Sequence, residues 1–450
     1  MSLNRRFRSG IWMSALAWGA AGLCLLPIVA VALAALTGGL ETVTSLAETV
    51  LPRYARATAL MVLIVATGTA TIGTGTAWLV TMTRFPGRRV LEIALALPLA
   101  FPAYVLAYAY TDFLDHPGWV QTTLRDLTGW GPRDYWFPEI RSLPGAALML
   151  MLVLYPYVYL LARAAFLQQS ATAYIAARTL GHGPWSAFFR ISLPVARPAI
   201  AGGVLLTIME TIADFGTVSY FNVQTFATGI YQSWFSFADR SAAAQLALVL
   251  LGVALLLAAL ERAQRSRQRH HGAGRRFERM EPPRLTGYRA ALALAFCATP
   301  VLLGFLLPAG LLLWMGWGSG QLILTERYLG FLQNSVTLAS VAALVTVAAA
   351  VLLGFNARLH PTRANRTAIA IGGLGYAVPG GVIAVGLMVP FAAFDNALDA
   401  WMRATFDIST GLLLTGSIWL LVAAYTVRFM AAALSAYDAG LSTINPNIDA

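Results

Sequence analysis

Hydrophobic stretches of about 20 residues recur along this chain, and they constrain its fold more than any other feature. A bilayer core of about 30 Å needs roughly 20 apolar residues in a helix. Because lipid offers no hydrogen-bond partners, the backbone N–H and C=O groups of such a helix must hydrogen-bond to one another within the segment. Charged residues make up only 11% of the chain, against roughly 25% in soluble domains. We therefore expect an all-α polytopic membrane protein with ten spans, near residues 11–37, 57–82, 90–111, 144–167, 198–221, 241–261, 288–317, 335–357, 367–393 and 411–436.

Arginines fill alternate gaps between these stretches, and Asp and Glu collect in the others. Because positive loops stay inside, the N-terminus and the Arg-rich loops are expected in the cytoplasm. The N-terminal apolar run, 11–36, is longer than the roughly 7–15 residues of a signal-peptide core, so we interpret it as a retained helix.

The net charge of +11 raises the question of nucleic-acid binding. Its densest part, 262–287, lies midway along the chain beside an apolar stretch. Arginines placed there favour a cytoplasmic linker touching anionic lipid, with no nucleic-acid partner.

A polar loop at 172–200 separates two expected spans and is far longer than the roughly 2–8 residues that usually join packed helices. Gly181 can end a first short helix and turn the chain back. A second segment then places Trp185, Phe188, Phe189 and Ser192 on one side at helical spacing. Pro194 and Pro198 are expected to stop this segment and to start the next span. Two short helices joined in this way are suited to docking into a groove of a partner protein. The alternative is an amphipathic hairpin that lies on the lipid headgroups.

The loop resembles the coupling motif of binding-protein-dependent ABC transporter permeases, which reads E-A-A, three residues, G, nine residues, I-x-L-P. Only the leading Glu departs, since Ile175 takes its place. The resemblance implies that the following residues contact the ATPase: Ala176, Ala177, Gly181, Trp185, Ile191, Leu193 and Pro194.

Two sequence pairs suggest an internal repeat. Residues 56–60 resemble 334–338, and Pro-Ala-Tyr-Val-Leu-Ala at 102–107 resembles Pro-Gly-Gly-Val-Ile-Ala at 379–384. Six spans per half make these parallel repeats. The family then implies two type-I ABC permease repeats, the second incomplete, with about 90 residues expected beyond Ala450.

The expected divisions follow from this repeat. They are an N-terminal helix with its external loop (1–55), a first permease domain (56–261), the linker (262–287), a seventh helix with its loop (288–333), and a second permease domain truncated at the start of its coupling loop (334–450).

The run from about 160 to 234 looks most like fused permeases that import ferric iron. Such membership implies a bacterial inner-membrane subunit that works with two separate ATPases and a periplasmic or lipid-tethered binding protein. Thiamine, polyamine and phosphonate importers remain alternatives, as do a secondary transporter and a membrane scaffold.

The chain is not expected to be an enzyme. A P-loop needs a lysine, and the sequence contains none. No cofactor or resident metal is indicated, and Cys24 and Cys297 both lie in apolar runs.

Glu210 and Asp214 stand at i and i+4 inside an expected span, on one helix face. Ionisable residues at such depth suggest function, so they are candidates for the translocation path and for transient contact with a hard cation. A structural role, by hydrogen bonding to neighbouring helices or pairing with an arginine, is the equal alternative. Glu92 is expected to pair with Arg88, and the aromatics of 112–141 are expected to form an interfacial belt.

Overall fold

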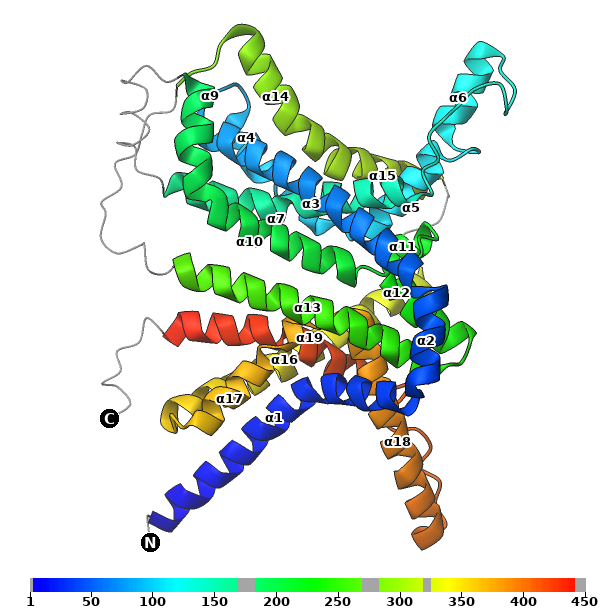
Figure 1. Cartoon of the computed structure of the whole chain (residues 1–450), viewed down its shortest axis with the longest axis vertical. Coiled ribbons are helices and arrows are strands. Elements are labelled where there is room, and N and C mark those ends of the chain that lie inside the picture. Colours follow the sequence, from blue (N-terminus) through cyan, green and yellow to red (C-terminus); the bar gives the residue numbers. More distant parts are fainter. Residues whose placement is uncertain (1–2, 169–182, 269–282, 319–324, 442–450) are drawn as a thin grey trace. The chain divides into compact units, whose positions relative to one another are not determined.

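In the computed structural model the chain is described over residues 3–168, 183–268, 283–318 and 325–441, and every regular element in these ranges is a helix (Figure 1). The elements are α1 (Leu3–Thr37), α2 (Gly39–Thr49), α3 (Leu51–Met82), α4 (Arg88–Ala94), η1 (Leu97–Ala100), α5 (Ala103–Leu114), α6 (Trp119–Thr128), α7 (Leu143–Leu167), α9 (Pro184–Ala187), η2 (Phe188–Ser192), α10 (Leu193–Ala213), α11 (Gly216–Tyr220), α12 (Phe226–Tyr231), η3 (Gln232–Ser236), α13 (Arg240–Gln268), α14 (Gly287–Val301), η4 (Leu302–Leu306), α15 (Leu307–Gly318), α16 (Glu326–Leu359), α17 (Arg363–Gly372), η5 (Gly375–Ala377), α18 (Gly380–Phe406) and α19 (Ile418–Leu441).

Nine helices of the described residues are long and apolar enough to cross a membrane, or up to ten if a bent pair counts as one span. This confirms the expected all-α polytopic class. The expected third span, 90–111, is not continuous, because its two parts meet at 92° between Ala100 and Ala103. The expected ninth span breaks in the same way, between α17 and α18.

Proline causes both breaks. Pro102 and Pro379 each cap the following helix with extended backbone, at ψ 135° and 147°. The residue before a proline is driven out of the α region, so the preceding 3₁₀ turn cannot continue as helix. Both Phe101 and Val378 are accordingly extended.

The same series of elements therefore occurs twice. A long helix, a short helix, a 3₁₀ turn, a proline-capped helix and a further long helix appear as α3–α4–η1–α5–α7 and again as α16–α17–η5–α18–α19, with the additional short helix α6 in the first series. The correspondence predicted between residues 102–107 and 379–384 agrees with this order.

The chain forms two compact units that are not continuous in sequence. The α3 unit comprises Val50–Thr228 and Leu256–Gln321, and the α16 unit comprises Met1–Thr49, Gly229–Leu255 and Leu322–Ala450. The helices that precede each series pack on the other series: α1 contacts α16, α17 and α18, whereas α14 and α15 contact α3, α4 and α5. The domain limits expected from the sequence describe the order along the chain and stay a prediction.

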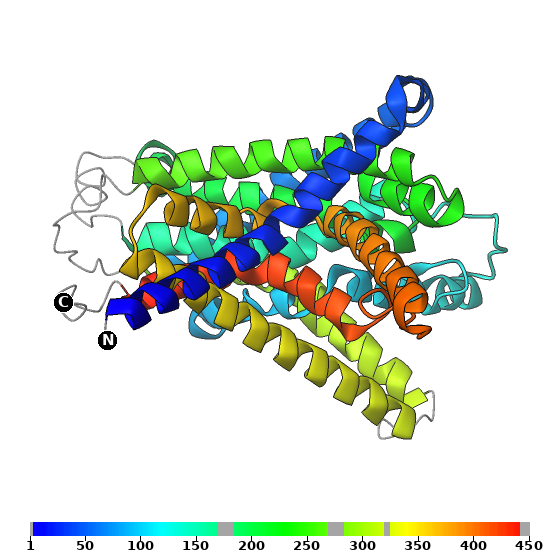
Figure 2. The ribbon, with the colours of Figure 1, turned by 90° about the horizontal axis from the view of Figure 1, so that it is seen from below.

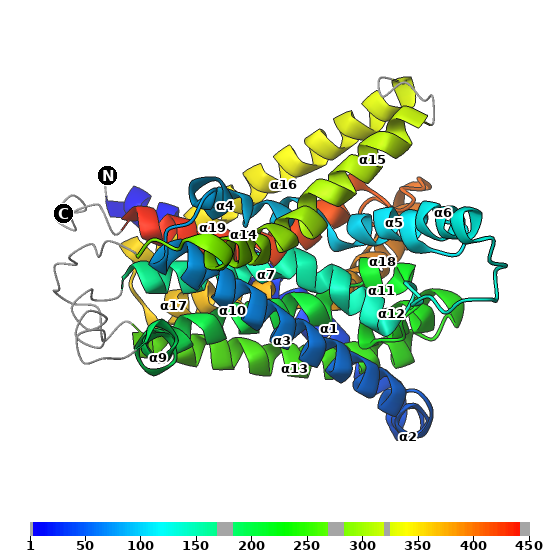
Figure 3. The same cartoon turned by 90° about the horizontal axis from the view of Figure 1, so that it is seen from above.

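In the α3 unit, α3, α7 and α10 pack against one another (Figure 3). Two glycines allow the backbones to approach. A Cβ at Gly73 would lie 2.8 Å from the amide nitrogen of Tyr159, and one at Gly203 would lie 2.7 Å from the Cα of Val158. Small residues at such crossings favour helix association in a membrane, because they let the backbones pack closely. Moving a leucine side chain from lipid to a helix interface gains little, since the lipid tails are equally apolar.

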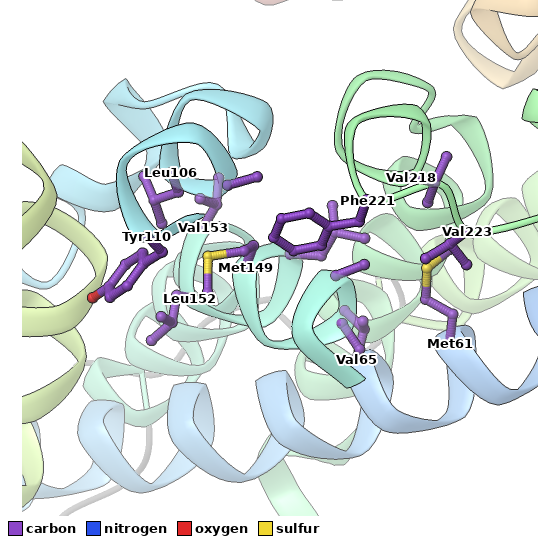
Figure 4. Close-up of a cluster of buried hydrophobic side chains, with 14 of the residues drawn as sticks. Met61, Val65, Leu106, Tyr110, Met149, Leu152, Val153, Val218, Phe221 and Val223 are labelled. Carbon is purple, nitrogen blue, oxygen red and sulfur yellow. The ribbon is translucent and has the colours of Figure 1, made fainter. Parts of the chain in front are cut away.

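A cluster of buried side chains joins α3, α5, α7 and α11 in this unit (Figure 4). The cluster contains Met61 and Val65 of α3, Met149 of α7 and Phe221, which directly follows α11. The Tyr110 hydroxyl donates to the backbone carbonyl oxygen of Leu303, in the π-helix η4, at 2.6 Å. This bond holds α5 to the α14–α15 helix.

In the α16 unit, α1 packs against α16, α17 and α18 (Figure 2). A Cβ at Gly386 would lie 2.4 Å from the carbonyl oxygen of Pro27, so α18 crosses α1 at its proline. The Ser14 hydroxyl donates to the buried Asn356 side chain at 3.1 Å. Arg428, in the middle of α19, donates to the backbone oxygens of Tyr376 and Val378, which lie at the break between α17 and α18.

We predict that Gly73→Ala lowers the free energy of unfolding by about 1–3 kcal/mol, because a methyl group there overlaps backbone atoms that cannot move aside. Gly22→Ala is the matched control, since nothing lies within 4 Å of that position on α1. Thermal unfolding of the purified protein in detergent measures both. Equal unfolding temperatures for the two variants would contradict the packing described.

Candidate coupling segment and intramembrane carboxylates

The described part of the long loop, 183–194, is helical and leads directly into a span. Elements α9, η2 and α10 follow one another without a break from Pro184 to Ala213. The expected loop residues Ala176, Ala177 and Gly181 lie outside the described residues, and so does the side chain of Trp185. Their roles stay predictions.

Pro194 lies in the first turn of α10, so it starts the span as expected. It does not separate the span from the segment before it, contrary to the other half of that expectation, since α9, η2 and α10 are continuous. The π-turn before it, Phe188–Ser192, shifts the hydrogen-bond pattern by one residue. The segment we call the coupling segment (183–194) is therefore continuous with the membrane helix that follows.

The coupling segment does not present its aromatic side chains on one side, so that prediction was wrong. Phe188 and Ser192 are buried, whereas Phe189 is 57% exposed. The five-residue π-turn rotates the side chains away from the 3.6-residue period on which the expectation was based. Ile191, Leu193 and Pro194 are half-buried.

Phe188 packs against Trp78 of α3, with ring centroids 5.0 Å apart. Its other face meets Phe189 edge-on at 4.9 Å. Both Phe188 and Trp78 belong to a buried cluster that also contains Leu95, Tyr159 and further residues of α3, α4, α7 and α14. Sequence reasoning missed Trp78, since nothing local distinguishes it from a lipid-facing tryptophan.

The two candidate carboxylates are not on one continuous helix. Glu210 lies in the last turn of α10, but Asp214 is the residue at which the helix ends, with an extended ψ of 127°. Its carboxylate accepts from the amides of Thr217 and Val218 and from the Thr217 hydroxyl, each at 3.1 Å. Asp214 thus caps α11, which supports the structural alternative.

The described residues contain no group of three or more His, Cys, Asp or Glu side chains that could hold a metal ion. A path role for Glu210 and Asp214, and their transient contact with a cation, stay predictions. The three hydrogen bonds of Asp214 nevertheless show that this carboxylate already has a structural task.

Glu92 pairs with Arg163 of α7 and not with Arg88. The Arg88 side chain turns back and donates to the carbonyl of Val80, while the Tyr159 hydroxyl donates to the carbonyl of Glu92 at 2.7 Å. Helix spacing alone favoured Arg88, but the packing of α4 on α7 brings Arg163 closer. The pair fixes α4 beside the cluster that holds Phe188.

Residues 112–141 fold into a small lobe around α6. The Arg125 guanidinium donates to the Tyr135 hydroxyl at 2.9 Å and to the carbonyl of His116 at 3.0 Å, and the Tyr135 hydroxyl donates to Gln121. Arg141 and Asp115 form an ion pair of 3.2 Å at its base. Polar contacts within the segment thus hold its fold. The sequence analysis expected only that its aromatic residues form an interfacial belt, and it did not predict this lobe.

The helices and their composition define a multi-pass, all-α membrane protein over the described residues. Residues 69–270 match the family model described as binding-protein-dependent transport system inner membrane component. Residues 69–270, which include the loop motif, are therefore similar to the inner membrane components of binding-protein-dependent transport systems, as that motif predicted. The apolar helices and this similarity together support a multi-pass protein of an inner membrane.

Relatives in this family transport several substrates. The chain is 26% identical to the Fe(3+)-transport system permease protein FbpB 2 of Haemophilus influenzae, over 76% of this chain and 64% of that protein. It is 29% identical to the molybdenum transport system permease protein ModB of Escherichia coli, over 40% of this chain and 78% of that protein. It is 34% identical to the sulfate transport system permease protein CysW of Escherichia coli, over 32% of this chain and 46% of that protein. The chain thus spans just under two thirds of the iron permease.

We predict that Asp214→Ala lowers stability by about 0.5–2 kcal/mol, the usual cost of losing a helix cap, whereas Asp214→Asn costs less because one acceptor oxygen remains. Thermal unfolding in detergent compares the two variants with the unchanged protein. If Asn and Ala cost the same, or neither costs anything, the capping role is wrong.

Proposed function

We propose that this chain is the transmembrane subunit of an ABC importer that carries ferric iron from a binding protein on the outer side into the cytoplasm. Separate ATPase subunits supply the energy, because a P-loop needs a lysine and these 450 residues contain none. The observation that carries the proposal is the family match combined with 76% coverage of this chain by the Fe(3+) permease.

The coupling segment supports the ATPase partnership. It joins a membrane helix without a break, and its described surface exposes Phe189 and Arg190. An exposed aromatic ring beside a cation on a rigid helix suits docking into a groove of another protein. The coupling residues Ala176, Ala177, Gly181 and Trp185 would contribute the rest of this contact.

The orientation of the chain belongs to the same proposal. The N-terminus and the Arg-rich loops lie in the cytoplasm under the positive-inside rule, so the coupling segment reaches the ATPases and the 112–141 lobe reaches the outer side. The binding protein is then a partner on that outer side.

Other substrates are alternatives with the same architecture. Two relatives are transport permeases for molybdenum and sulfate, and fused permeases for thiamine, polyamine or phosphonate remain alternatives. A secondary transporter would need no coupling segment.

We predict that deleting the gene from iron-starved cells abolishes uptake of radioactive ferric iron and leaves thiamine, molybdate and sulfate uptake intact. A plasmid copy of the gene should restore iron uptake. Loss of one of the other substrates with intact iron uptake would contradict the iron assignment and keep the importer architecture.

A further inference from the structure

Phe188 is where the coupling segment enters the buried core of the α3 unit. Its side chain is 8% exposed, and Trp78, its partner at 5.0 Å, is 6% exposed. The neighbouring Phe189 shares the same short π-turn but is 57% exposed. Two adjacent phenylalanines of one segment thus point to different surroundings, one toward the protein interior and one away from it.

Trp78 lies four residues before the end of α3, a helix of 32 residues. At about 1.5 Å per residue, α3 is about 48 Å long, enough to cross a bilayer. Trp78 belongs to the same buried cluster as Leu91 of α4 and Tyr159 of α7, so its surroundings come from these helices as well as from α3. A force applied at its ring therefore acts on several helices at one end of the unit.

A second contact holds the continuous helix from Pro184 to Ala213 farther along its length. At Gly203 the backbone of α10 touches that of α7 at Val158, with no space for a side chain between them. This helix thus contacts α3 at Phe188 and α7 at Gly203. Interiors packed to this density pass a displacement on to their neighbours and do not absorb it.

We propose that Phe188 is a positioning residue that transmits movement of the coupling segment to α3 through Trp78. This rests on the proposed function. Phe189, on the exposed side, belongs to the surface that meets the ATPase. Truncating Phe188 leaves a void beside Trp78, and the segment then moves without carrying α3 with it.

The test uses the complete importer, with its ATPases and binding protein, reconstituted in proteoliposomes. Phe188→Ala should leave ATPase co-purification and ATP hydrolysis within about twofold of the unchanged complex and lower iron imported per ATP hydrolysed at least about tenfold. Phe188→Leu, which fills more of the void, should lie between the two, and Trp78→Ala should resemble Phe188→Ala. A merely structural loss of folded protein would lower import and hydrolysis together.

Phe189→Ala is the matched control and should weaken ATPase co-purification while leaving iron imported per ATP unchanged. If the Ala variant does not fold, Phe188→Leu and Trp78→Phe carry the test through the same ratio. An unchanged ratio in the folded Phe188 variants, or loss of the ATPase from them, overturns the inference. If the unchanged complex holds no ATPase or imports nothing with ATP, the proposed function fails instead.

Discussion

Lipid tails are as apolar as leucine, so helices in a bilayer gain little by hiding apolar side chains from one another. What holds the α3 unit together must be close contact between backbones. Gly73 of α3 and Gly203 of α10 meet the same stretch of α7, around Val158, and neither site has space for a Cβ. The α16 unit uses the same device where Gly386 crosses α1 at Pro27. The coupling segment, the capped end of α10 and the lobe of residues 112–141 all depend on helices placed by these contacts.

The same constraint explains how the spans can be broken. A break in hydrocarbon exposes carbonyls, and each needs a donor. In the α16 unit Arg428 donates to Tyr376 and Val378 beside the proline break. At the end of α10 Asp214 accepts from the amides of α11 instead. Some charged residues at membrane depth thus form hydrogen bonds with backbone groups at the breaks. A charged residue within an expected span is therefore not by itself evidence of a translocation path.

Much of the architecture could be predicted from the sequence, because span length, arginine distribution and proline position are local signals. The bends at Pro102 and Pro379 were readable too, but hydropathy does not register backbone direction, so both spans were expected to be continuous. The capping pair Asp214 and Thr217, three residues apart, was a recognisable cap pattern. The burial of Phe188 on Trp78 could not be predicted, since it depends on a helix more than 100 residues away in sequence. The π-turn at 188–192 was not predicted either, because the expectation used the 3.6-residue period of an α-helix. The coupling residues at 176–181 lie outside the described residues and stay predictions.

The most direct test of the central claim, that this chain imports its substrate by ATP-driven coupling, is uptake into proteoliposomes holding the complete complex. Ferric iron and its binding protein are supplied at one face and ATP at the other. The account predicts that import requires ATP and continues unchanged when ionophores abolish proton and sodium gradients. Import that persists without ATP and stops with the ionophores would contradict it and identify a secondary transporter.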